Sequence, residues 1–134
     1  MEAIIAQRRN QDCAVAAIGW YFHLRYEDAF VAAVSVNPHM IRGGGLTVRQ
    51  IQAVAARLGR TLRRVHHQRV DLEADAGILV VNWNQPAKQG GSYGHCVVLR
   101  KGTIICPRLP SAWDAEEYLT FEDGRVGTLL VETE

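Results

Sequence analysis

The sequence predicts an α+β domain in which N-terminal helices pack against a C-terminal, mostly antiparallel sheet. Before Gly59 the apolar side chains recur at helical spacing, whereas after it they fall into short runs typical of strands. Helices followed by strands, rather than alternating with them, favour this class over a parallel α/β fold. With 134 residues, of which 48% are hydrophobic, we expect one domain over residues 1–134.

Three helices are expected in the first half of the chain. The run from Cys13 to about Leu24 is apolar almost throughout, which indicates a buried, central helix. A second helix covers Glu27 to Val36 and stops at Asn37-Pro38, because proline disfavours helix in the residue before it. A third helix begins after Thr47, which forms a capping box with the glutamine three residues on, and it ends at a glycine.

Short strands follow. Lys101-Gly102 between two apolar runs predicts a tight hairpin turn. Ser111 with Asp114 resembles a second capping box, for a short helix through Leu119. The glycine-rich loop from Asn84 to Gly94 is expected to form an active-site rim. The expected strands are Thr61 to His66, Ile78 to Trp83, His95 to Arg100, Thr103 to Cys106 and Gly127 to Glu132.

Composition and charge exclude several classes of partner. A net charge of +1 provides no global field for nucleic acid or for an anionic membrane, so we expect a protein, peptide or small-molecule partner. No run approaches the length of a membrane span and the N-terminal residues lack a signal-peptide core, so we expect a cytoplasmic protein. No metal or cofactor is expected, because the histidines and cysteines lack metal-ligand spacing. Oligomeric state is left open.

Cys13 is the strongest candidate for a reactive group. It ends a polar run at the start of the buried helix, where the helix dipole favours thiolate over thiol. His95 follows 82 residues later at the head of an apolar strand and could act as general base. The Gln7 side chain and the Cys13 backbone amide could together form an oxyanion hole. Strand alternation places Cys96 on the face opposite His95, and we expect Cys96 and Cys106 to be buried core residues.

These residues resemble a known family. Gln-x4-Asp-Cys before a buried helix, Gly-Gly-x-Thr before another helix, a strand ending Asn-Trp-Asn and Gly-His-x-Val-Val-Leu are similar to the peptidase C39 group of papain-like cysteine peptidases. The resemblance spans about residues 5 to 132. It implies a papain-like fold, with Cys13 as nucleophile, His95 as general base and Gln7 as oxyanion donor. The usual substrate of the group is a leader peptide that ends in two glycines.

The third member of the catalytic triad departs from the family pattern. The family has Asp-Pro on the strand after the histidine, and its aspartate orients the imidazole, whereas this chain has Cys106-Pro107. A thiol is a poor acceptor for an imidazole N–H. Asp114 is the nearest later carboxylate and is a possible substitute, although its expected capping position explains it without catalysis.

The function expected from the sequence is therefore peptide-bond hydrolysis through a thioester on Cys13. The same Cys-His dyad would also support deamidation, acyl transfer or removal of a ubiquitin-like modifier, and the chain is loosely similar to Josephin deubiquitinases. A further alternative is a degenerate domain that binds a peptide without cleaving it. As an alternative to a cytoplasmic protein, the domain could be an effector or toxin module that a larger system delivers.

Overall fold

The structure, a computed structural model, describes residues 13–42, 45–84, 94–108 and 111–133. In this part of the chain four α-helices pack on a six-stranded, fully antiparallel sheet, which confirms the α+β class. The helices are α1 (Cys13–Tyr21), α2 (Tyr26–Val36), α3 (Val48–Arg57) and α5 (Ala115–Glu122), with 3-10 turns η1 (Pro38–Arg42) and η2 (His67–Arg69). The strands are β1 (Thr61–His66), β2 (Ala76–Trp83), β3 (Gly94–Arg100), β4 (Thr103–Cys106), β5 (Ser111–Asp114) and β6 (Gly124–Thr133).

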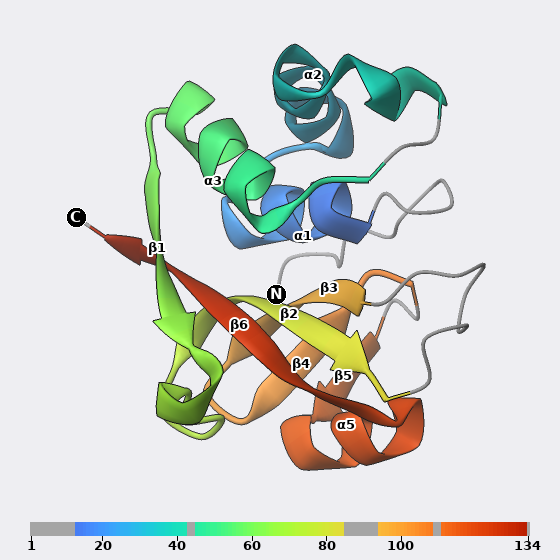
Figure 1. Cartoon of the computed structure of the whole chain (residues 1–134), viewed down its shortest axis with the longest axis vertical. Coiled ribbons are helices and arrows are strands. Elements are labelled where there is room, and N and C mark those ends of the chain that lie inside the picture. The colour runs from blue at the N-terminus through green and yellow to red at the C-terminus, as the bar shows by residue number, and fades with distance from the viewer. Residues whose placement is uncertain (1–12, 43–44, 85–93, 109–110, 134) are drawn as a thin grey trace.

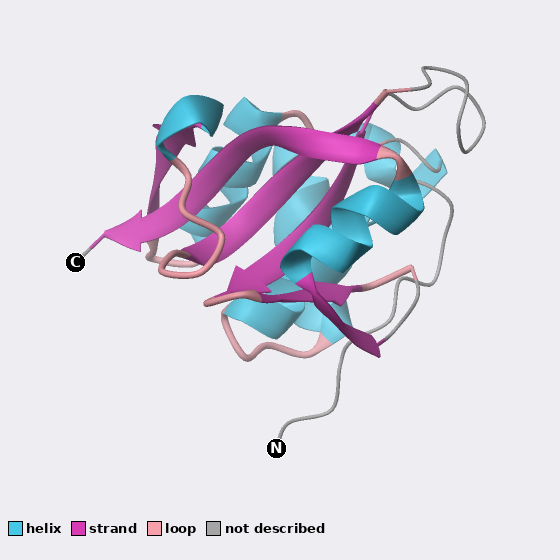
Figure 2. Cartoon of the chain, turned by 90° about the horizontal axis from the view of Figure 1, so that it is seen from below, coloured by secondary structure: helices cyan, strands magenta, loops and turns pink. Residues whose placement is uncertain are grey.

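The helices lie on both faces of the sheet. In Figure 1, α1, α2 and α3 lie above the sheet and α5 lies below it. In the view from below in Figure 2, α5 lies in front of the strands and α1 lies behind them. Each face has its own apolar core: Cys96 and Val98 pack with α1 to α3, and Val97 and Leu99 pack with α5. The alternation predicted for this strand is therefore confirmed.

The helix α1 is shorter than predicted. Seven of its nine residues are buried, as expected for a central helix. It ends at Tyr21 rather than Leu24, because His23 adopts a left-handed conformation with φ 59°. The amide of Leu24 then bonds back to the carbonyl of Gly19, and that of His23 to Trp20, in a Schellman arrangement.

Two local signals in the sequence had the predicted effect. Thr47 accepts a hydrogen bond from the Gln50 amide and the Gln50 side chain accepts one from the Thr47 amide, so the capping box of α3 is complete. Lys101 and Gly102 both have positive φ, 45° and 88°, as a two-residue hairpin turn of type I′ requires. The turn pairs β3 with β4 so that Leu99 faces Ile104.

The capping box expected at Ser111 is wrong. Ser111 begins the edge strand β5 and pairs with Cys106, so its backbone is committed to the sheet. Asp114 is the N-cap of α5 instead, and its carboxylate accepts a hydrogen bond from the Glu117 backbone amide at 3.1 Å. The helix therefore begins three residues later than the sequence pattern suggested and continues to Glu122.

The C-terminal strand β6 lies inside the sheet. The strand order is β1-β6-β2-β3-β4-β5, so β6 separates β1 from β2. Its pairing with β2 shifts register between Val80 and Val81, where Gly127 is the extra residue. At Gly127 a Cβ would lie 2.7 Å from the nitrogen of the Asn82 side-chain amide, so a larger residue in this bulge would displace that side chain. The central position of β2 and β3 places the start of β3 next to α1.

Candidate active site

Cys13 lies at the beginning of the described part of α1, against the start of β3. Its side chain is half-buried, whereas those of Cys96 and Cys106 are buried. The Cys96 backbone N–H donates a hydrogen bond to Cys13 Sγ at 3.3 Å. This contact joins two residues that are 83 positions apart in the sequence. A strand amide directed at the sulfur stabilises negative charge on it, so the site favours the thiolate.

The pKa of the Cys13 thiol is lowered well below its ordinary value. The largest cause is a hydrogen bond from the Cys96 side chain, and a hydrogen bond and the positive charge of His95 act in the same direction. Burial opposes these effects but does not outweigh them. In return, the hydrogen bond to Cys13 and burial raise the pKa of Cys96, which keeps its proton. Cys13 is therefore the thiol of this pair that ionises.

His95 is almost fully buried, with 3% of its surface exposed. Burial of the ring acts against ionisation, but hydrogen bonds to Cys106 and Cys13, together with electrostatic attraction to these two side chains, raise the pKa of His95 to about 9. At neutral pH the imidazole is then protonated and Cys13 is its counter-ion. Cys13 and His95, predicted from the sequence as nucleophile and base, thus interact in the folded chain.

Cys106 lies next to the ring of His95. His95 Nε2 lies 3.4 Å from Cys106 Sγ, and the hydroxyl of Tyr118 donates to the same sulfur at 3.2 Å. Burial, followed by the charge and hydrogen bonding of Cys106, raises the pKa of Tyr118, so this hydroxyl stays a donor. Tyr118 therefore holds the sulfur of Cys106, and this sulfur in turn restrains the Nε2 edge of the His95 ring.

The indole ring of Trp83 fixes the plane of the imidazole. The two rings are stacked with centroids 6.0 Å apart and an angle of 12° between their planes. Trp83 is 4% exposed and comes from the end of β2, which pairs with β3. An electron-rich indole beside an imidazolium also favours its positive charge. Trp83 and Tyr118 contribute to the site although neither was among the predicted site residues; the motif Asn82-Trp83-Asn84 before the loop was the signal for Trp83.

The remaining predicted site residues fall elsewhere. Gln7, proposed as oxyanion donor, and residues 85–93 of the glycine-rich loop lie outside the described residues. Asp114 pairs with Thr103, at the opposite end of β4 from Cys106, which corresponds to about 10 Å along the strand. Because its carboxylate caps α5, the structure uses Asp114 for helix initiation and Cys106 for contact with His95.

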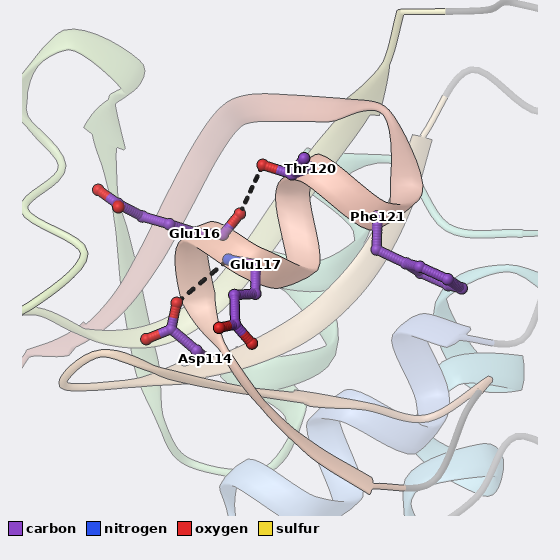
Figure 3. Close-up of a pocket in the computed structure, with 5 residues that line it drawn as sticks. All are labelled: Asp114, Glu116, Glu117, Thr120 and Phe121. Atoms are coloured by element: carbon purple, nitrogen blue, oxygen red, sulfur yellow. Dashed lines mark hydrogen bonds between the residues drawn. The ribbon is translucent and has the colours of Figure 1, made fainter.

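A separate depression lies on the outer side of α5 (Figure 3). Its walls are mainly acidic, and the ring of Phe121, which stacks on Trp113 at 5.2 Å, lies at its edge. The depression includes neither Cys13 nor His95. The lining residues are Asp114, Glu116, Glu117, Thr120 and Phe121.

Comparisons with family models, curated proteins and solved structures gave no match. Among the described residues, no group of three or more histidine, cysteine or carboxylate side chains is arranged to hold a metal ion. The helices described here are also too short or too polar to cross a membrane.

Proposed function

We propose that this chain is a papain-like thiol hydrolase of the peptidase C39 type, which cleaves a peptide bond through a thioester on Cys13. The observation that carries the proposal is the interaction between Cys13 and His95. The pKa of the thiol is lowered and that of the imidazole is raised, which is the combination expected of a thiolate–imidazolium pair. A buried structural cysteine has no need of such a partner.

In the proposed reaction the Cys13 thiolate attacks the carbonyl carbon of the substrate. His95 then gives its proton to the leaving amine, which departs as the C–N bond breaks and leaves a thioester. Nε2 contacts Cys106, so Nδ1 is the nitrogen proposed to face Cys13 and the substrate. In the second half of the cycle neutral His95 takes a proton from water, and the resulting hydroxide releases the acyl group from sulfur.

The oxyanion of each tetrahedral intermediate needs hydrogen-bond donors. The Cys13 backbone amide at the start of α1 is one candidate, and Gln7 stays the predicted second donor. Removing one such donor typically slows acyl transfer by about 100-fold or more. A Gln7→Ala variant with an intact Cys13 labelling rate but slowed turnover would support this role.

A carboxylate is not the only group that can orient the imidazole. The third triad member fixes the tautomer and orientation of the histidine without taking its proton. Contacts from Cys106 and Trp83 restrain the ring at its edge and its face, and Tyr118 holds Cys106. These contacts favour an active dyad despite the cysteine at the family aspartate position.

The resemblance to the C39 group favours a substrate whose cleavage site follows two glycines. Deamidation, acyl transfer and removal of a ubiquitin-like modifier would use the same pair and differ in the group that leaves or accepts the acyl chain. Mass spectrometry of products from a double-glycine peptide, a glutamine peptide and a ubiquitin-like substrate separates these reactions. Cleavage after the second glycine alone would support the proposed peptidase.

A peptide-binding module without catalysis is the second candidate, and the thiol in contact with His95 Nε2 favours it, because sulfur accepts hydrogen bonds weakly. Iodoacetamide at about pH 6.5 distinguishes the two. A catalytic thiolate should react at Cys13 well before Cys96 and Cys106, and His95→Gln should slow this reaction, whereas the exposed control His39→Gln should not. Equal labelling of all three thiols would contradict the hydrolase and support the binding module.

A further inference from the structure

A second thiol lies directly against the proposed nucleophile. Cys96 contacts Cys13 through its backbone N–H, 3.3 Å from Sγ, and through a hydrogen bond between the two side chains. Strand alternation directs Cys96 toward α1, while the neighbouring His95 packs beside Cys106. The hydrolysis proposed above uses the Cys96 side chain as a hydrogen-bond donor to the Cys13 thiolate and gives its sulfur no redox role.

The backbone geometry allows the two sulfurs to be joined. An amide nitrogen is about 1.5 Å from its own Cα, so Cys13 Sγ lies within about 5 Å of the Cys96 Cα. A disulfide requires the two Cβ atoms to be about 4 Å apart. The side chains of Cys13 and Cys96 already hydrogen bond to each other, so rotation about their Cα–Cβ bonds can bring the two sulfurs together.

We propose that Cys13 and Cys96 form a reversible disulfide when a hydroperoxide oxidises the site, with Cys13 as the oxidised nucleophile and Cys96 as the resolving thiol. This inference rests on the proposed function for the reactivity of Cys13. The disulfide would block the nucleophile Cys13, and its reduction would restore the free thiol.

The steps balance without a further cofactor. The Cys13 thiolate attacks one oxygen of the hydroperoxide, the O–O bond breaks, and the products are a sulfenic acid and an alkoxide or hydroxide. The Cys96 sulfur then attacks Cys13 Sγ. The S–O bond breaks, and hydroxide leaves with the Cys96 proton as water. Reduction by a dithiol returns both thiols through exchange.

The third cysteine, Cys106, lies on the other face of the sheet from Cys96. Cys106 is fully buried beside Ala115 and Tyr118 in the core on the α5 side of the sheet, and its sulfur contacts His95 and Tyr118. The strand β3 therefore separates the Cys13–Cys96 pair from the core that holds Cys106. Oxidation should link Cys13 to Cys96 and leave Cys106 reduced.

Trypsin places the three cysteines on separate peptides, which makes the linkage readable by mass. The expected peptides are Asn10–Arg25 with Cys13, Gln89–Arg100 with Cys96 and Gly102–Arg108 with Cys106. The folded protein is treated with hydrogen peroxide, the remaining thiols are blocked with N-ethylmaleimide, and the digest is analysed before and after dithiothreitol. We expect the first two peptides to appear as one linked species that dithiothreitol separates, while the third carries N-ethylmaleimide.

Cys96→Ser and Cys96→Ala are the test variants, and Cys106→Ser is the matched control. Without Cys96, Cys13 should proceed to sulfinic and sulfonic acids and lose the recovery with dithiothreitol, whereas Cys106→Ser should keep the link. A disulfide to Cys106, irreversible oxidation of Cys13 in the unmodified chain, or an unoxidised Cys13 would overturn the proposal. Because peptide masses do not depend on turnover, this result is independent of whether the chain hydrolyses peptides.

Discussion

The charge state of His95 is the most direct consequence of the site geometry. The pKa of this imidazole is raised from 6.5 to about 9, which corresponds to about 3 kcal/mol in favour of the imidazolium form. Burial is the largest single effect and favours the neutral ring, so the increase depends on the thiol partners Cys106 and Cys13. At pH 7.5 His95 should therefore be positively charged although it is buried.

Cysteine-to-alanine variants test this balance one partner at a time. Cys13→Ala and Cys106→Ala should each lower the pKa of His95, because each removes a hydrogen bond and an electrostatic attraction that favour the charged ring. The double variant leaves burial as the remaining effect, so its pKa should fall below 6.5. The sign follows from burial, which penalises only the charged form.

The pKa can be measured by NMR titration of histidine labelled with carbon-13 at its ring positions. The signal of His95 is the one that disappears in His95→Gln, and His39→Gln serves as a control that removes a different signal and leaves the His95 titration unchanged. If His95 titrates at or below 6.5 in the unmodified protein, the thiolate–imidazolium pair does not exist. A titration that Cys13→Ala leaves in place would show that the two residues do not interact.

Two further predictions concern the ring contact and the sheet. Iodoacetamide at about pH 6.5 should label Cys13 faster in Cys106→Asp than in the unmodified chain, and more slowly in Cys106→Ala. The reason is that a carboxylate accepts a hydrogen bond from His95 Nε2 more strongly than sulfur does. The reverse order of labelling rates would contradict the role given to Cys106. Gly77→Ala should lower the free energy of unfolding by more than about 2 kcal/mol in urea, since its Cβ would overlap the Leu130 carbonyl oxygen in the sheet. Gly59→Ala is the comparison, with open space around the Cβ and φ +76°, and should cost about 1 kcal/mol; equal losses would contradict the reasoning.

Local elements were predictable where the signal lies within a few residues. The capping box of Thr47 and the turn at Lys101-Gly102 need only residues that are adjacent or one helical turn apart, and both formed as predicted. The strands β1 and β4 have the predicted bounds for the same reason. The prediction failed at Ser111, where pairing with Cys106 competes with helix capping, and this competition is not visible in a local window.

The sequence by itself determined that Cys13 begins a buried helix and that His95 begins an apolar strand on the face opposite Cys96. Only the tertiary structure decided what surrounds them. It inserted β6 between β1 and β2, placed Cys96 against Cys13, and brought Tyr118 under the sulfur that holds His95.

The physical reason is the range of the interactions. Hydrogen bonds along a helix and the alternation of a strand repeat over two to four residues, so a sequence pattern displays them directly. The contact between Cys13 and β3 joins positions 83 residues apart and depends on how α1 packs over the whole sheet. Residue types can nominate a nucleophile and a base, but packing selects the neighbours that set their charge.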